Sequence, residues 1–308
     1  MARCHLRLGT RGSPLALWQA RWVAQALQQH HPGLRLDIVV ITTTGDRYRH
    51  QPLPALGGKG LFVKEIEAAL QRRTIDVAVH SMKDVPTQLP PGLRLSAVPP
   101  RGEVRDAFVG RPGCRLTTAT GPCTVGTSSR RRQAQLLALR PELCVRDLRG
   151  NVETRLRKVR RGEVDGVVLA AVGLQRLGLE AAISEWLSPD VMLPAPGQGA
   201  LALETREEPW LDALLAPLHD PATASAVSAE RAFLAHLGGG CTVPVAALAS
   251  CEGDTLRLRG LVATVDGRRL LRQELCGPVR EAEALGRQLA EQLLAAGAAA
   301  LLHPEKEA

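Results

Sequence analysis

The sequence predicts an α/β protein of three domains, the first two built on mainly parallel sheets and the third a small α+β domain. Three observations predict this. Strand-like and helix-like segments alternate over the first two thirds of the chain, two Pro/Gly-rich segments interrupt the alternation, and the pattern changes near Pro221. Alternation of strands and helices is typical of parallel sheets with crossover helices. A chain of 308 residues also exceeds what one small core accommodates.

The elements of the first two thirds follow from local periodicity. Residues 34–42 (LRLDIVVIT) are nearly all apolar or β-branched, which predicts a strand buried on both faces. Apolar residues within 62–70 repeat at helical spacing, and alternation over 75–79 predicts the next strand. Strand, helix and strand are then expected at residues 144–148, 152–159 and 166–171.

The two Pro/Gly-rich segments indicate where the chain passes between domains. Residues 98–102 (VPPRG) form the first crossing, and residues 193–199 (LPAPGQG) form the second. Two crossings indicate that the second domain is inserted into the first. We therefore expect the following boundaries: domain 1 at 1–99 with 200–217, domain 2 at 100–199, and domain 3 at 218–308.

The third domain shows a different pattern. A helix is expected at residues 223–236, followed by strands at 243–250, 255–264 and 269–275. Leucines at 285, 289 and 293 then indicate a last helix, and Gly297 is a candidate for its C-terminal cap. One helix, three strands and a second helix make a small α+β domain.

Charge and composition limit the partners. The net charge is +8, and arginines are concentrated between positions 101 and 176, which favours an anionic partner. Aromatic residues make up 3%, too few to stack many bases, so no nucleic-acid partner is expected. The seven cysteines include no C-x-x-C pair, so neither a metal site nor a disulfide framework is expected. No signal peptide or membrane span is recognisable, so we expect a cytoplasmic protein.

Three expected helix starts carry residues suited to anion binding. They lie at 11–14 (RGSP), 127–132 (TSSRRR) and 149–155 (RGNVETR). A helix N-terminus offers free N–H groups and the positive end of the dipole, and guanidinium forks complete an anion pocket. Each one alone is equally compatible with an ordinary cap beside solvated arginines. Three such starts after strands, where α/β sheets bind ligands, favour a function.

Two loops add reactive candidates. Asp84 lies in HSMKD (80–84), directly after an expected strand, and nearby positive charge such as Lys83 favours its ionised form. Such a carboxylate can stabilise a cation or move a proton, although a loop salt bridge is an equal alternative. Lys59 follows two glycines in a loop without P-loop spacing, which suits a lid or a merely flexible loop.

Cys241 follows three consecutive glycines. A sharp glycine turn leaves a thiol unscreened, and a loop thiol near a cationic cleft is a candidate nucleophile. The alternative is a structural turn that happens to contain a cysteine. A passive anion-binding protein needs no such thiol, so Cys241 separates an enzyme from a carboxylate-binding protein.

Seven motifs, in one order along the chain, carry a resemblance to a known family. They are LGTRGSPLA from Leu8, GGKGLFVKEIE from Gly57, AVHSMKDVP from Ala78, VGTSSRRRQ from Val125, LRGNVETRL from Leu148, LPAPGQGAL from Leu193 and GGGCTVPV from Gly238. Over essentially its whole length the chain resembles the porphobilinogen deaminases, also called hydroxymethylbilane synthases. The resemblance implies two periplasmic-binding-protein-like α/β domains and a small third domain.

The resemblance also implies a reaction of heme biosynthesis. Four porphobilinogen molecules are joined head to tail, with loss of ammonia at each step, to give the linear tetrapyrrole hydroxymethylbilane. It implies a dipyrromethane cofactor held by a thioether to Cys241, and a cytoplasmic monomer. Each pyrrole carries an acetate and a propionate, which arginine forks suit better than lysines. The alternative is a non-catalytic, periplasmic-binding-protein-like protein that binds carboxylates.

Residue by residue, the resemblance implies Asp84 as the catalytic group. The implied cofactor contacts are Cys241, Ser13, Lys83, Ser81, Thr127, Ser129, Arg131, Arg132, Arg149 and Lys59. The implied substrate contacts are Arg11, Arg149, Arg155, Arg176 and Gln198. Two positions depart from the family pattern: Ala55 replaces a frequent lysine, and Arg130 replaces an apolar residue and is expected to face solvent.

Overall fold

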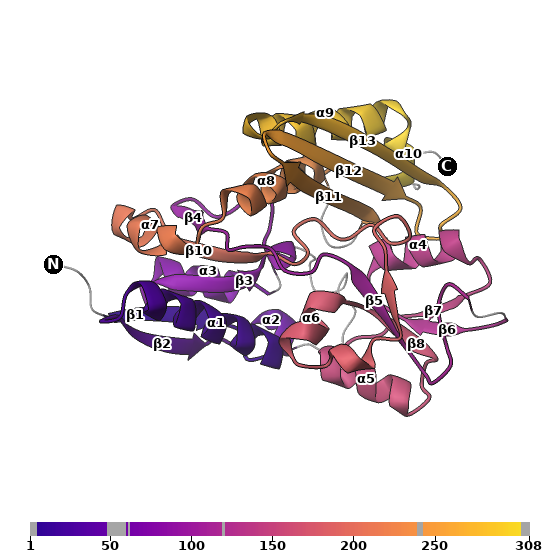
Figure 1. Ribbon diagram of the computed structural model, residues 1–308, viewed down its shortest axis with the longest axis horizontal. Helices are drawn as coiled ribbons and strands as arrows, with labels where there is room; N and C mark the ends of the chain where they lie inside the picture. The colour runs from indigo at the N-terminus through magenta and orange to yellow at the C-terminus, as the bar shows by residue number, and fades with distance from the viewer. Residues whose placement is uncertain (1–4, 48–59, 61, 119–120, 239–242, 303–308) are drawn as a thin grey trace. The chain divides into compact units, whose positions relative to one another are not determined.

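The chain passes three times between two compact units. A computed structural model describes residues 5–47, 60, 62–118, 121–238 and 243–302 (Figure 1). Unit 1 is Met1–Gly102 with Gly199–Ala224, and unit 2 is Glu103–Gln198 with Ser225–Ala308. The first two passages fall at the predicted crossings, whose backbones meet where Gly102 N donates to Gly199 O at 3.2 Å, and the third follows Ala224. The three-domain boundaries stay a prediction, because unit 2 includes the C-terminal residues.

Unit 1 holds a five-stranded sheet in the order β2-β1-β3-β10-β4. β1 pairs in parallel with β2 and β3, whereas β10 runs antiparallel to β3 and β4, so the prediction of a mainly parallel sheet is confirmed. The strands are β1 (His5–Thr10), β2 (Arg35–Val40), β3 (Val77–Ser81), β4 (Leu93–Ala97) and β10 (Leu201–Arg206). The helices are α1 (Pro14–His30), α2 (Thr44–Arg47), α3 (Lys64–Gln71), η2 (Met82–Asp84), α7 (Pro209–Leu215) and η4 (Ala216–Leu218).

Both faces of this sheet are covered by helices. Side chains of α1 and α7 form one core with Val77 and Val79, whereas α3 packs against Ala78 on the opposite face. This follows from the alternation of side chains along β3. The connections that follow β1 and β3 lie at the carboxyl edge of the sheet, where those strands end.

The burial predicted for residues 34–42 is wrong. β2 is the edge strand of the sheet, its residues are only partly buried, and Val40 is 53% exposed. An apolar, β-branched composition favours a strand, but it does not distinguish a central strand from an edge strand. The strand itself is confirmed, because β2 pairs with β1 along its whole length.

Unit 2 repeats the topology of unit 1. Its five-stranded sheet has the order β7-β6-β8-β5-β9, with β6 parallel to β7 and β8, and β5 antiparallel to β8 and β9. In each sheet the antiparallel strand is the one that follows a crossing. The strands are β5 (Asp106–Gly110), β6 (Thr124–Gly126), β7 (Cys144–Arg146), β8 (Gly166–Ala170) and β9 (Glu185–Leu187). The helices are α4 (Arg130–Leu139), α5 (Val152–Arg160), α6 (Ala171–Arg176) and η3 (Glu180–Ala182).

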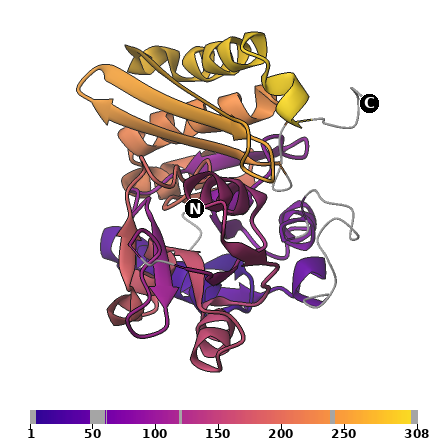
Figure 2. The same cartoon turned by 90° about the vertical axis from the view of Figure 1, so that its right-hand side faces the viewer.

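The C-terminal part is an antiparallel three-stranded sheet (Figure 2). On β12, Leu256 and Leu258 pack into the core formed with helices α8 and α9, whereas Leu261 packs with Ala134 of α4. Gly297, with φ +95°, follows the last long helix as predicted. The elements are α8 (Pro221–His236), β11 (Val245–Glu252), β12 (Thr255–Ala263), β13 (Leu270–Pro278), η5 (Val279–Glu281), α9 (Ala282–Ala295) and α10 (Ala298–Leu302).

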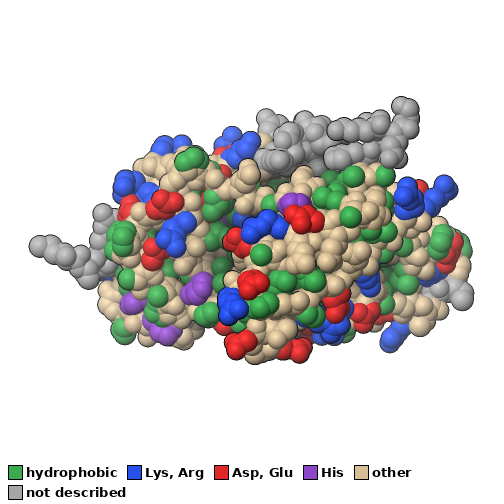
Figure 3. All heavy atoms as spheres, turned by 90° about the horizontal axis from the view of Figure 1, so that it is seen from above, with side chains coloured by type: hydrophobic (Ala, Val, Ile, Leu, Met, Phe, Trp, Pro, Cys, Tyr) green, Lys and Arg blue, Asp and Glu red, His purple; other side chains and the backbone are tan. Residues whose placement is uncertain are grey.

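Charge is mixed on the face of the molecule drawn in Figure 3. Lysine and arginine side chains are interspersed with aspartate and glutamate among the described residues of that face. Within the described ranges, no helix has both the length and the apolar character needed to cross a membrane.

Candidate active site

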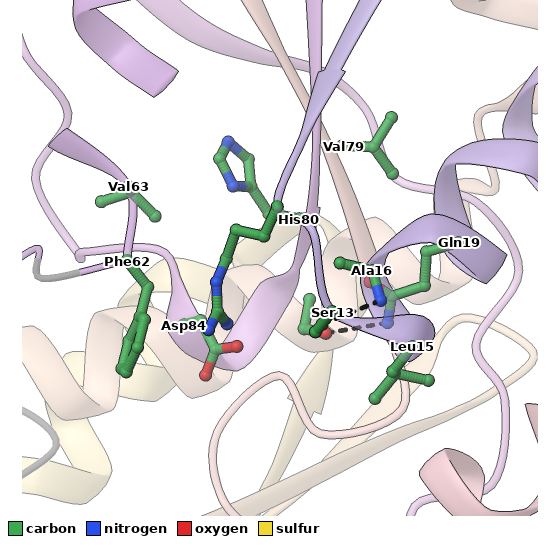
Figure 4. Close-up of a pocket in the computed structure, with 11 residues that line it drawn as sticks. Ser13, Leu15, Ala16, Gln19, Phe62, Val63, Val79, His80 and Asp84 are labelled. Atoms are coloured by element: carbon green, nitrogen blue, oxygen red, sulfur yellow. Dashed lines mark hydrogen bonds between the residues drawn. The ribbon is translucent and has the colours of Figure 1, made fainter. Parts of the chain in front are cut away.

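A cavity in unit 1 lies where β1 and β3 end. Its volume is about 60 Å³, and its lining includes Arg11, Ser13, Gln19, Ser81 and Asp84 (Figure 4). Arg11 and Ser13 follow β1, Ser81 ends β3, and Asp84 lies in the short helix η2 directly after β3. Because the carboxyl ends of parallel strands meet at one edge of a sheet, residues 70 positions apart come together here. The structure thus brings together four of the residues that the sequence singled out.

The helix start expected at 11–14 is confirmed by α1. Ser13 Oγ accepts a hydrogen bond from Ala16 N at 3.2 Å, and Pro14 occupies the first helical position. The cap uses Ser13 as an acceptor and leaves its O–H available to an acceptor in the cavity. Gln19, which the sequence reasoning missed, donates from Nε2 to Ser81 Oγ at 2.9 Å. Its signal in the sequence is a polar residue on the buried, apolar face of the helix.

Arg11 is held by a carboxylate that the sequence reasoning did not identify. Its Nε and Nη2 donate to the two carboxylate oxygens of Asp46 at 3.1 and 2.6 Å. Burial alone would raise the pKa of Asp46, but hydrogen bonds from Arg11 and Thr43, with the charge of Arg11, lower it below its ordinary value. The guanidinium carbon also lies 4.2 Å from the centre of the Phe62 ring.

The end of β3 is anchored by a buried pair, one member of which, His80, also lines the cavity. His80 Nε2 lies 2.9 Å from Glu204 Oε2 of β10, and both side chains are almost fully buried. In Figure 4 the His80 ring points away from Asp84. Glu67 of α3 lies near this pair, and burial together with the charge of Glu204 raises the pKa of Glu67. The pair therefore ties β3 to β10 directly before the cavity residues Ser81 and Asp84.

In unit 2, Arg131 and Arg132 bind the protein's own carboxylate. Each donates from Nη2 to Asp106 at 2.7 Å, and Gln198 Nε2 donates to Asp106 Oδ1 at 2.9 Å. Burial alone would raise the pKa of Asp106, but the charges and hydrogen bonds of the two arginines lower it strongly. Arg131 also donates from Nη1 to Leu193 O at 2.7 Å. Three predicted site residues thus meet around one fully buried aspartate.

The helix starts expected at 127–132 and 149–155 are confirmed by α4 and α5. Ser129 Oγ accepts from Arg132 N at 3.4 Å, and Thr127 Oγ1 accepts from Ser129 N at 3.2 Å. Asn151 Oδ1 accepts from Thr154 N at 2.9 Å. Gly150, with φ +120°, precedes this cap, and a Cβ there would lie 2.7 Å from Thr154 Cγ2.

In unit 2, Arg132 and Arg149 act electrostatically on Arg155, and we call these three residues the arginine cluster. Burial and the positive charges of Arg132 and Arg149 lower the pKa of Arg155 to about 10, although Asp147 acts in the opposite sense. Arg132 Nε and Arg149 Nη1 are buried and have no hydrogen-bond partner among the described residues. A buried donor without a partner is costly, and an anion would satisfy it and relieve the repulsion. The arginine cluster therefore has the properties of an anion site.

The remaining predicted residues are placed as follows. Arg176 ends α6, and burial lowers its pKa to about 10. Lys83 lies in η2 beside Asp84. Arg130 is exposed at the start of α4, as predicted. Lys59, Cys241 and Ala55 lie outside the described residues. Within the described part of the chain, no group of three or more His, Cys, Asp or Glu side chains is arranged to hold a metal ion.

Comparisons with known proteins decide the family. Residues 6–210 match the family model described as "Porphobilinogen deaminase, dipyromethane cofactor binding domain", and residues 224–295 match "Porphobilinogen deaminase, C-terminal domain". The chain belongs to the porphobilinogen deaminase family. It therefore contains the dipyrromethane cofactor-binding domain of this enzyme family, and the predicted resemblance is confirmed.

Curated relatives agree over nearly the whole chain. The porphobilinogen deaminase of Syntrophotalea carbinolica is 57% identical, over 98% of this chain and 96% of its own length. That of Roseiflexus castenholzii is 52% identical, over 97% and 99% respectively. A TRAP periplasmic solute binding protein from Desulfovibrio salexigens has a TM-score of 0.43 and 11% identity, over 70% of this chain and 72% of its own. A similarity this low supports no conclusion about function.

Proposed function

We propose that this chain condenses four porphobilinogen molecules head to tail, releasing ammonia, into hydroxymethylbilane. The observation that carries the proposal is that the Asp84 carboxylate and the Arg11 guanidinium line one cavity, in a chain that belongs to this family over most of its length. A carboxylate beside an arginine suits a substrate that has carboxylates of its own and passes through a cationic stage. The dipyrromethane cofactor, when bound, supplies the acceptor carbon to which the first substrate unit is joined.

The residues present fit such a cofactor. Its four carboxylates would satisfy the buried donors Arg132 Nε and Arg149 Nη1, which have no partner among the described residues. Arg131 also holds Asp106, since its Nη1 donates to Leu193 O and its Nη2 donates to Asp106 Oδ2. The proposed cofactor contacts are Cys241, through a thioether, and Ser13, Lys59, Ser81, Lys83, Thr127, Ser129, Arg131, Arg132 and Arg149.

Incoming substrate would be held by guanidinium groups. Arg11, Arg149, Arg155, Arg176 and Gln198 are the proposed substrate contacts. The arginine cluster favours a polyanion because each carboxylate that binds reduces the repulsion among like charges. Holding both reactants in place converts a bimolecular step into an effectively unimolecular one.

Asp84 is the proposed catalytic group. Its carboxylate, at the end of β3, would stabilise the positive charge that develops when ammonia leaves, and would accept a proton from a pyrrole nitrogen. The buried pair of His80 and Glu204 fixes the strand that carries it. Asp84→Asn keeps the shape but removes the charge, so we expect kcat to fall by at least about 100-fold with the fold intact.

The comparisons favour the enzyme over the alternative, a non-catalytic carboxylate-binding protein. The arginine cluster would serve it equally well, but it would need neither Asp84 nor a covalent anchor. We also propose that the enzyme is a cytoplasmic monomer without a nucleic-acid partner. The interspersed charges on the face in Figure 3 support the absence of a nucleic-acid partner. Light scattering of the purified protein measures whether it is a monomer.

Intact mass and turnover test the proposal together. The purified, denatured protein is weighed beside Cys241→Ser, and each is then incubated with porphobilinogen while ammonia and hydroxymethylbilane are measured. We expect a native mass above that of the sequence by two linked pyrroles, absent from the variant, and four ammonia molecules per product. A native chain that stays unmodified and inactive after incubation would contradict the proposal and favour the carboxylate-binding alternative.

A further inference from the structure

Arg11 presents only one edge to the cavity. A guanidinium has five N–H donors, and the edge formed by Nε and Nη2 is taken by the two oxygens of Asp46. Arg11 lines the cavity, whereas Asp46 does not. No acceptor among the described residues engages Nη1. The donors left for a ligand in the cavity are therefore those of the edge formed by Nη1 and Nη2.

Asp46 is itself held rigidly. Its side chain is 9% exposed, and Oδ2 accepts a second hydrogen bond from Thr43 Oγ1 at 2.8 Å. The helix that carries it, α2, is attached to α3, because Thr44 N and Thr44 Oγ1 both donate to Glu65 Oε1. The carboxylate of Asp46 thus occupies a fixed position relative to the sheet, and it fixes the orientation of the Arg11 guanidinium.

The face of the guanidinium is fixed as well. Phe62 lies under Arg11, and a Cβ on Gly45 of α2 would lie 2.2 Å from the Phe62 ring. Only a residue without a side chain lets α2 approach the ring this closely. Asp46 therefore restricts movement of the Arg11 guanidinium within its own plane, and Phe62 restricts movement perpendicular to that plane.

We propose that Asp46 is a positioning residue for porphobilinogen, which turns the Nη1 edge of Arg11 toward the cavity to receive a substrate carboxylate in two parallel hydrogen bonds. The inference rests on the proposed function, in which Arg11 contacts substrate. A preset fork loses little rotamer freedom on binding, and a misplaced one loses both hydrogen bonds together. Asp46 touches no substrate itself and acts only through Arg11.

A double-mutant cycle tests this. Asp46→Asn, Arg11→Gln and the double variant are compared with the wild type by kcat and KM for porphobilinogen. We expect Asp46→Asn to lower kcat/KM about tenfold, mainly through KM, because the carboxylate contact exists before the chemical step. In the Arg11→Gln background the same substitution should cost less than twofold, because no fork remains to be positioned. Asp37→Asn, which removes an exposed partner of His5, is the matched control and should change neither constant.

Each outcome decides the inference. If Asp46→Asn lowers kcat/KM tenfold both in the wild type and in Arg11→Gln, the inference is overturned, because Asp46 would then only stabilise α2. An unchanged kcat/KM in the single variant would overturn it too. If Asp46→Asn lowers cofactor loading or unfolds at the assay temperature, Thr43→Val, which removes the hydrogen bond from Thr43 Oγ1 to Asp46, replaces it in the cycle. The expected loss of kcat/KM is then about threefold, and the same outcomes decide. Failure of the proposed function is distinguished by the wild type, which would then release no ammonia.

Discussion

The two five-stranded sheets share one topology but treat their arginines differently. In unit 1 the arginine beside the cavity, Arg11, is neutralised by Asp46. In unit 2 a fully buried carboxylate, Asp106, is shared by Arg131 and Arg132, and Arg149 and Arg155 add further positive charge. Beside its cavity unit 1 thus holds an arginine paired with a carboxylate, whereas the arginine cluster of unit 2 holds an excess of positive charge.

This difference separates two tasks. A guanidinium already paired with a carboxylate binds a further anion weakly but in a defined direction, which suits the orientation of one reacting group. An excess of partly buried guanidinium groups binds anions strongly because each anion removes repulsion. The arginine cluster of unit 2 therefore favours strong binding of carboxylates, whereas Arg11 of unit 1 favours a defined orientation of one carboxylate.

The largest expected effect comes from breaking the balance in unit 2. Asp106→Asn leaves two buried guanidinium groups without their counter-charge, and breaking a buried ion pair from one side costs about 3–5 kcal/mol. The free energy of unfolding, measured with guanidinium chloride, should fall by that amount. Arg111→Gln, which removes the exposed partner of Asp165 in the same unit, should change it by less than about 1 kcal/mol. A small loss in Asp106→Asn would contradict our account of the arginines.

A smaller and opposite effect is expected in the arginine cluster. Arg149→Gln removes one of three like charges together with a buried, unsatisfied donor, so the Tm of the protein without bound cofactor should stay equal or rise. Cys241→Ser, which cannot attach the cofactor, provides that background. Added mellitate, a benzene polycarboxylate, should raise the Tm by binding to the arginine cluster. In Arg149→Gln, about ten times more mellitate should be needed for the same rise in Tm. A lower Tm with unchanged protection would show that Arg149 is structural.

Sequence alone predicted the features of this site that depend on residues close together in the chain. Ser13, Ser129 and Asn151 cap helices because a cap depends on a residue and its next three neighbours. The positions of these caps at the ends of strands followed from the alternation of strand and helix. The family motifs supplied the roles of individual residues, which no periodicity contains.

The pairs that decide the charge balance could not be predicted in this way. Asp46 lies 35 residues from Arg11, and Asp106 lies 25 residues from Arg131. Such pairs depend on which strands become neighbours, and a single sequence leaves many carboxylates as candidate partners. For the same reason the edge position of β2 was missed, because burial depends on neighbouring strands as much as on composition.

The smallest expected effect is the acid dependence of the unit 1 pair. The pKa of Asp46 in the folded protein is lowered from its ordinary value of 3.8, so the folded state favours the ionised carboxylate. A lowered pKa stabilises the fold above pH 3.8 and this stabilisation disappears as the pH falls through the folded-state pKa. Asp46→Asn lacks this contribution, which is about 1 kcal/mol for a partly buried, charged pair. Its free energy of unfolding should therefore lie below that of the wild type at pH 6, and the two curves should converge as the pH falls below 3.8. A constant difference down to pH about 2 would mean that Asp46 stabilises α2 by shape and not by charge.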